Sequence, residues 1–128
     1  MNKNLHQIGK WLFILPSAAF GLLHFGPLEF SLPYVPAYLP VPAFWVYFIG
    51  ACLLAFVVAA AFKRLDGLAA LALAVLLLTF VFTIHLPKAF TGDFLGIIAT
   101  FRDSCMAGAS ILYAYHLAVD LRFTGIHS

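Results

Sequence analysis

The segment from Gly67 to Pro87, GLAALALAVLLLTFVFTIHLP, constrains the fold more than any other part of the chain. It carries no charged residue from Gly67 to Ile84, and as an α-helix that stretch is about 27 Å long, enough to cross the hydrocarbon core of a bilayer. A polar residue, His85, then stands at its end. Because an imidazole at the edge of hydrocarbon costs free energy unless it has a partner, His85 is the first candidate for a functional site.

The composition of the whole chain agrees with a membrane location. Of its 128 residues, 64% are hydrophobic and 9% are charged, and the mean hydropathy is +1.03. A soluble domain of this size cannot bury so much apolar surface, because small domains leave a large share of their residues exposed. The few Lys and Arg residues are scattered and form no basic run, which argues against nucleic acid as a partner. We therefore expect an integral membrane protein with the lipid bilayer as its main partner.

Four apolar segments are expected to span the membrane, at about residues 8–25, 43–62, 67–86 and 97–121. We expect Pro87 to end the third span, and residues 63–66 to form a tight turn between the second and the third. No repeat or linker divides the chain, so residues 1–128 are predicted to form a single integral membrane domain. The predicted fold is all-α, a four-transmembrane-helix up-and-down bundle.

The distribution of positive charge predicts the orientation of this bundle. In an up-and-down topology, five of the seven Lys and Arg residues fall on the side of the two termini. Cytoplasmic loops carry an excess of Lys and Arg, so both termini are expected in the cytoplasm.

The segment between the first two spans, residues 26–42, has a different composition. It contains five of the seven prolines, which excludes a continuous helix, and Phe30, Tyr34 and Tyr38 alternate with them. A plain linker is one interpretation. The aromatic residues favour another, a proline-aromatic cap at the membrane surface, because aromatic side chains prefer the headgroup level. Glu29 is the only charged residue of this segment.

The predicted topology brings polar residues of several spans to one edge of the bundle, on its outward side. Asp103 shares a helix face with small residues and is expected to point inward, and the adjacent Arg102 is expected to pair with another helix rather than with Asp103. A carboxylate beside an imidazole fixes which ring nitrogen carries the proton, which suits proton handling. The predicted cluster consists of His24, Glu29, His85, Arg102 and Asp103.

Three functions are compatible with this cluster. The first is binding of a quinone or a similar amphiphile in a redox-associated protein, by all five residues. The second is a structural cluster in a non-catalytic membrane subunit or lipid-binding helper. The third is a metal or haem site. His24, His85 and Asp103 form an acceptable metal-ligand set and two histidines on facing helices could hold haem, although no short histidine spacing supports either.

Four segments of the sequence resemble the DoxX-like family of small membrane proteins. They are GLLHF (21–25), VPAYLPVPAFWVYFIGACLLA (35–55), LLLTFVFTIHLPKAF (76–90) and RDSCMAGASIL (102–112). The resemblance implies a four-helix protein of the bacterial inner membrane, with His24, His85, Arg102 and Asp103 at the family's recurring polar positions. The family takes its name from the small subunit of a thiosulfate:quinone oxidoreductase. By resemblance, a quinone ligand and either a partner redox subunit or a homo-oligomer are therefore expected. Whether the chain is itself an enzyme stays open.

Overall fold

A computed structural model of the chain describes residues 2–126, and within this range it contains helices and turns but no strand. The helical fraction is 78%, so the all-α prediction is confirmed. The long helices are α1 (Lys3–Leu23), α2 (Pro42–Phe62), α3 (Asp66–Phe80) and α5 (Phe94–Leu112). The shorter elements are the 3₁₀ turns η1 (Leu28–Phe30) and η2 (Leu32–Tyr34), the π-helical turns η3 (Val81–His85) and η4 (Tyr113–Leu117), and α4 (Leu86–Phe90).

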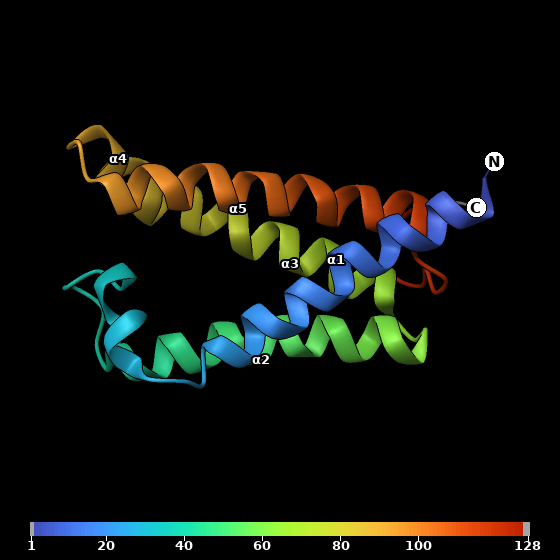
Figure 1. Cartoon of the computed structure of the whole chain (residues 1–128), viewed down its shortest axis with the longest axis horizontal. Helices are drawn as coiled ribbons and strands as arrows, with labels where there is room; N and C mark the ends of the chain where they lie inside the picture. The colour runs from blue at the N-terminus through green and yellow to red at the C-terminus, as the bar shows by residue number, and fades with distance from the viewer. Residues whose placement is uncertain (1, 127–128) are drawn as a thin grey trace.

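The long helices run up and down along one direction as two pairs (Figure 1). Helix α1 packs on α2, α3 packs on α5, and α2 joins the two pairs through its contacts with α3. The start of α1 and the segment after η4 lie at the same end of the molecule. Toward the other end, which carries η1, η2 and α4, the two pairs diverge (Figure 1).

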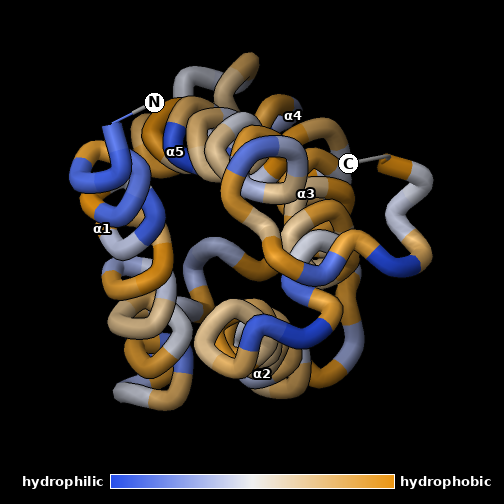
Figure 2. Tube along the Cα trace, turned by 90° about the vertical axis from the view of Figure 1, so that its right-hand side faces the viewer, coloured by the Kyte–Doolittle hydropathy of each residue, from blue (hydrophilic) through white to orange (hydrophobic). Residues whose placement is uncertain are grey.

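Three helices are long and apolar enough to cross a membrane: Pro42–Phe62, Asp66–Phe90 and Phe94–Leu117. Lys3–Leu23 meets the same criterion only together with Leu28–Tyr34, from which it is bent by 112°. Residues 2–126 thus contain three such helices, or four if this bent pair is one span, which is compatible with an integral membrane protein. Figure 2, which faces the end of the bundle where α1 begins, shows hydrophilic positions at the start of α1 and in the α2–α3 turn.

The prediction that Pro87 ends the third span is wrong, because the helix continues to Phe90. Pro87 lies in the first turn of α4, where a missing backbone N–H is tolerated. The turn before it, η3, is π-helical, and the Leu86 N–H donates to the carbonyl of Val81, five residues back. Such a wide turn changes the direction of the side chains that follow, and His85 at its end is buried. The last span also differs from its prediction, since η4 ends at Leu117 rather than near residue 121.

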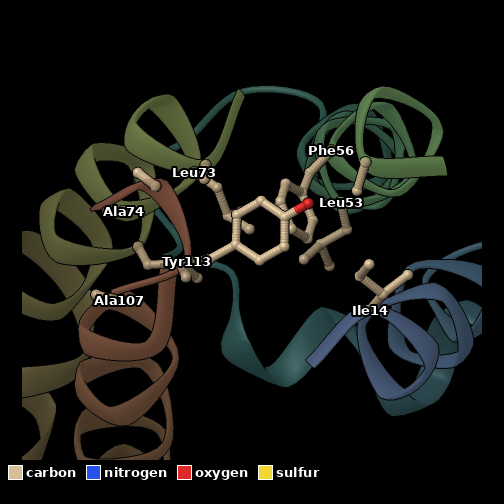
Figure 3. Packing of buried hydrophobic residues seen from close by; sticks show 11 residues of the cluster. Ile14, Leu53, Phe56, Leu73, Ala74, Ala107 and Tyr113 are labelled. Atoms are coloured by element: carbon tan, nitrogen blue, oxygen red, sulfur yellow. The ribbon is translucent and has the colours of Figure 1, made fainter. Parts of the chain in front are cut away.

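The apolar core is centred on Tyr113, which is fully buried in the half of the bundle away from η1 and η2. Its ring meets the ring of Phe56 edge-on, with centroids 5.2 Å apart. Figure 3 shows this ring between α2, α3 and the Ile14 side chain of α1, so that one aromatic residue joins both helical pairs. The ammonium of Lys10, a buried residue of α1, lies 5.9 Å from the centroid of the same ring.

A buried carboxylate, Asp66, lies at the start of α3, at one end of the bundle. Its oxygens accept hydrogen bonds from the Tyr113 hydroxyl at 3.0 Å and from the N–H groups of Val119, at 3.0 Å, and Asp120, at 2.8 Å. These bonds hold the segment after η4 against the start of α3. The sequence predicted that Asp66 lies in a tight turn and that the polar cluster lies at one edge of the bundle. In the structure, buried polar groups lie at both ends of the bundle.

Asp120 makes a second, exposed connection at this end. Its carboxylate accepts from the Leu65 N–H at 2.8 Å and pairs with the Arg122 guanidinium at 2.7 Å. The Arg122 guanidinium, helped by the Leu65 N–H, holds the pKa of the Asp120 carboxyl well below its usual range. Because the folded state has the lower pKa, the contribution of this carboxylate to stability is present above about pH 4 and is lost as the pH falls further.

Gly50→Ala is expected to lower the free energy of unfolding by about 1–3 kcal/mol, as overpacking does in other cores. A Cβ at Gly50 would lie 2.7 Å from the Cβ of His24 and 3.0 Å from the backbone oxygen of Gly21, so α1 would have to move away from α2. The measurement is thermal unfolding in detergent micelles. Gly108→Ala is the matched control: a Cβ there has no neighbour within 4 Å, and about 0.5–1 kcal/mol of added stability is expected. A Gly50→Ala protein as stable as wild type would contradict the close crossing of α1 and α2.

Candidate functional site

A cavity of about 420 Å³ lies where the two helical pairs diverge. We call it the chamber. Its wall is built by the end of α1, by η1 and η2, by α2, by α3 and η3, and by the first half of α5. Aliphatic and aromatic side chains make up most of this wall, and two of them, Leu23 and Phe30, are about 70% exposed. The chamber therefore has an apolar rim.

The proline-aromatic segment forms one wall of the chamber. It folds into the two short turns η1 and η2, and Phe30 and Tyr34 line the cavity. Two side chains from the helices hold the segment in place: Lys88 Nζ donates to the carbonyl of Pro33 at 3.0 Å, and Trp45 Nε1 donates to the carbonyl of Pro40 at 2.9 Å. These bonds tie the segment both to the end of the third helix and to the start of α2.

A polar corner of the chamber is formed by three of the predicted residues. The Nε2 atom of His85 lies 3.1 Å from Oδ2 of Asp103, and the Nε–H of Arg102 donates to Oδ1 of Asp103 at 2.8 Å. Asp103 is buried, as predicted. The prediction that Arg102 would not pair with Asp103 is wrong, because the long arginine side chain folds back so that Nε reaches its neighbour's carboxylate.

The Arg102 side chain also contacts two aromatic rings of the wall. Its Cζ atom lies 5.2 Å from the ring centroid of Phe20 and 5.6 Å from that of Tyr34, distances at which cation–π attraction operates. Only its Nε donates a hydrogen bond to residues 2–126. The terminal Nη atoms of the guanidinium are therefore free to donate to another acceptor, and the side chain is 33% exposed.

His24 lies in the wall of the chamber but apart from the Asp103 group. Its Nδ1 atom lies 2.8 Å from the backbone oxygen of Phe20, one helical turn earlier, and its ring stands edge-on to the Phe20 ring at 4.8 Å. No hydrogen bond or ion pair joins it to His85, Arg102 or Asp103 in the described part of the chain. Phe20 thus contacts both His24, in a T-shaped arrangement, and the Arg102 guanidinium, which lies over its ring.

Glu29 is not brought to this site. It is exposed, it is not part of the chamber wall, and it makes no ion pair within residues 2–126. The metal set of His24, His85 and Asp103 is not assembled either. Over the same range, no three His, Cys, Asp or Glu side chains are grouped so that they could hold a metal ion.

The sequence interpretation missed the aromatic part of the site. Phe20, Tyr34 and Trp45 all line the chamber. A signal for Phe20 was present, since it precedes His24 by four residues and therefore lies on the same helix face. Tyr34 belongs to the proline-aromatic segment, but a sequence without regular structure does not indicate which of its rings turns inward.

The geometry allows one chemical description of the polar corner. Asp103 accepts from a cation, Arg102, so it acts as a carboxylate, and the His85 nitrogen facing it carries a proton. The other ring nitrogen of His85, Nδ1, is buried and has no partner among residues 2–126. The positive charge of Arg102 and the negative charge of Asp103 then balance each other.

No protein-family model, no curated protein and no solved structure matches the chain. The resemblance to the DoxX-like family therefore depends on the sequence segments alone and stays a prediction.

Proposed function

We propose that the chain is a DoxX-like protein of the bacterial inner membrane that binds a quinone or a similar amphiphile in the chamber. In this proposal α1 with its bent continuation supplies the fourth span, and both termini lie in the cytoplasm. The two ends on one side of the bundle and the excess of Lys and Arg at that side support this orientation (Figure 1). A redox-associated role, with a partner redox subunit or a second copy of the chain, is proposed on the family resemblance.

The observation that carries the proposal is an apolar chamber with a single charged corner. A cavity of about 420 Å³ is within the usual range for small-molecule sites, which are mostly apolar with a few placed polar groups. The free Nη atoms of Arg102 are placed to donate to a carbonyl oxygen, and the rings of Phe20, Tyr34 and Trp45 are available to an aromatic ring. Asp103 accepts a hydrogen bond from Arg102, and His85 contacts Asp103, so these two residues hold the Arg102 side chain in position.

The position of the rim supports access from the lipid. Leu23 and Phe30 are large apolar side chains that are exposed at the chamber wall. In a bilayer such side chains favour contact with acyl chains, so an amphiphile could pass from the membrane into the chamber without crossing water.

A second candidate is a non-catalytic membrane subunit or lipid-binding helper in which the polar corner is structural. It is favoured by the mutual contacts of His85, Asp103 and Arg102, which already join α5 to η3 without a ligand. The metal and haem alternatives have less support, because both ring nitrogens of His85 are engaged or buried.

Arg102→Met tests the proposal, because it keeps an apolar stem over Phe20 and removes the free donors. We expect a short-chain quinone to quench the fluorescence of Trp45 saturably in a Trp11→Phe background, and Arg102→Met to weaken its binding by about 10- to 100-fold. Arg122→Met, the same change at the opposite end, is the control and is expected to bind as wild type does. An Arg102→Met protein that melts earlier yet binds quinone unchanged would favour the structural candidate.

A further inference from the structure

The two histidines of the chamber differ in what their ring nitrogens can do. His85 donates from Nε2 to the Asp103 carboxylate, and its Nδ1 is the only side-chain nitrogen or oxygen within residues 2–126 that is both buried and without a partner. Neither of its ring nitrogens is therefore available to bind a molecule in the chamber. His85 positions Asp103, and through it Arg102, but it has no free atom to offer.

His24 has the opposite arrangement. Its Nδ1 lies 2.8 Å from the backbone oxygen of Phe20, and a carbonyl can only accept, so this nitrogen carries the proton. In a neutral imidazole the other nitrogen, Nε2, then presents a lone pair. Within residues 2–126 this atom makes no hydrogen bond, and it is not buried. The ring is part of the chamber wall.

The chamber consequently presents one acceptor and one set of donors, both next to the Phe20 ring. The His24 ring lies 4.8 Å from the Phe20 ring centroid, and the Arg102 guanidinium lies 5.2 Å from it. A ring that carries a hydroxyl toward His24 and another oxygen toward Arg102 satisfies both groups. Phenols and the hydroxyl-bearing, reduced forms of quinones have this chemistry.

We infer that His24, and not His85, accepts a hydrogen bond from a hydroxyl of the ligand, and that the chamber prefers a hydroxylated ring to the same ring without the hydroxyl hydrogen. The inference rests on the proposed function, since it needs an amphiphile in the chamber. It specifies that a hydroxyl of the ligand is recognised, and it assigns different roles to the two histidines.

A matched pair of redox-stable probes tests this preference. 4-Heptyloxyphenol and its methyl ether have the same ring and tail, and the ether carries a methyl group in place of the hydroxyl hydrogen. Binding is followed by Trp45 fluorescence in the Trp11→Phe background, after correction for the partition of each probe into detergent. The wild-type protein is expected to bind the phenol about tenfold more tightly than the ether, as for one good hydrogen bond.

Variants of the two histidines assign the acceptor. His24→Phe is expected to bind the ether as wild type does and to lose the preference for the phenol, because the new ring keeps the packing but has no lone pair. His24→Gln supplies an amide oxygen and is expected to restore part of the preference. His85→Phe is expected to weaken both probes by a similar factor and to keep their ratio. His24→Leu gives the same comparison as His24→Phe if the latter does not fold.

The possible results separate the inference from the proposed function. A preference that survives in His24→Phe and disappears in His85→Phe overturns the assignment. Equal binding of phenol and ether by wild type overturns the inference but leaves the proposed function standing, since the chamber is still filled. Binding of neither probe, nor of a short-chain quinone, would mean that the proposed function fails and the inference with it.

Discussion

Replacing Asp66 by alanine is expected to lower the free energy of unfolding by about 3 kcal/mol. The substitution leaves three donors without an acceptor: the buried Tyr113 hydroxyl and the partly buried N–H groups of Val119 and Asp120. It also releases the segment after η4 from the start of α3. Thermal unfolding in detergent, followed by circular dichroism, measures the effect.

Two further variants show whether the loss comes from the buried network. Asp66→Asn keeps the shape and one acceptor oxygen, and a loss of about 1–2 kcal/mol is expected. Asp93→Ala makes the same Asp-to-Ala change at an exposed helix start, where the carboxylate accepts one bond, from the Leu95 N–H at 3.2 Å, and about 1 kcal/mol is expected. Equal losses for Asp66→Ala and Asp93→Ala would show that Asp66 contributes no more than an ordinary helix cap.

Asp103→Leu is expected to reduce both stability, by about 3 kcal/mol, and binding of a short-chain quinone, by more than tenfold. It removes the carboxylate that receives Arg102 Nε at 2.8 Å and His85 Nε2 at 3.1 Å, in a place where Asp103 itself is buried. The Arg102 guanidinium, no longer held at its base, can then turn out of the chamber and leave the rings of Phe20 and Tyr34. Unfolding and quinone titration of the same preparation measure the two effects.

Glu29→Leu is the control for this substitution. It also replaces an acidic residue by leucine on the same side of the bundle, but Glu29 is exposed and has no ion pair within residues 2–126. Neither stability nor quinone binding is expected to change. If Glu29→Leu weakens quinone binding as much as Asp103→Leu does, the ligand does not depend on the Asp103 group, and the original five-residue cluster becomes the better description.

The sequence contained enough information for the helices and for the inward direction of Asp103. Long uncharged segments require helices of bilayer length, and the small residues on one face of the last helix indicate which side packs. The continuation of the third helix past Pro87 was not predictable in this way. A proline normally marks a helix end, and only the π-helical turn before it allows the helix to accept one here.

The candidate site was predictable in its polar residues but not in their pairing. His24, His85, Arg102 and Asp103 all line the chamber, whereas Glu29 does not. Sequence spacing gives the side of a helix on which a residue lies, but not how far a long side chain bends, and for that reason the contact of Arg102 with its neighbour was missed. Asp66 was missed because its partners, in the segment after η4, are more than 50 positions away in the sequence.

The π-helical turn Val81–His85 acts as a one-residue insertion within an otherwise regular helix. With that residue in place, His85 meets Asp103, and Lys88, one turn further along, reaches the carbonyl of Pro33. Without it, every later side chain would be displaced by about 100° around the helix axis, and His85 would lose its partner. A change in length of one residue at this turn therefore separates a helix that completes the chamber from one that only anchors the chain in a membrane.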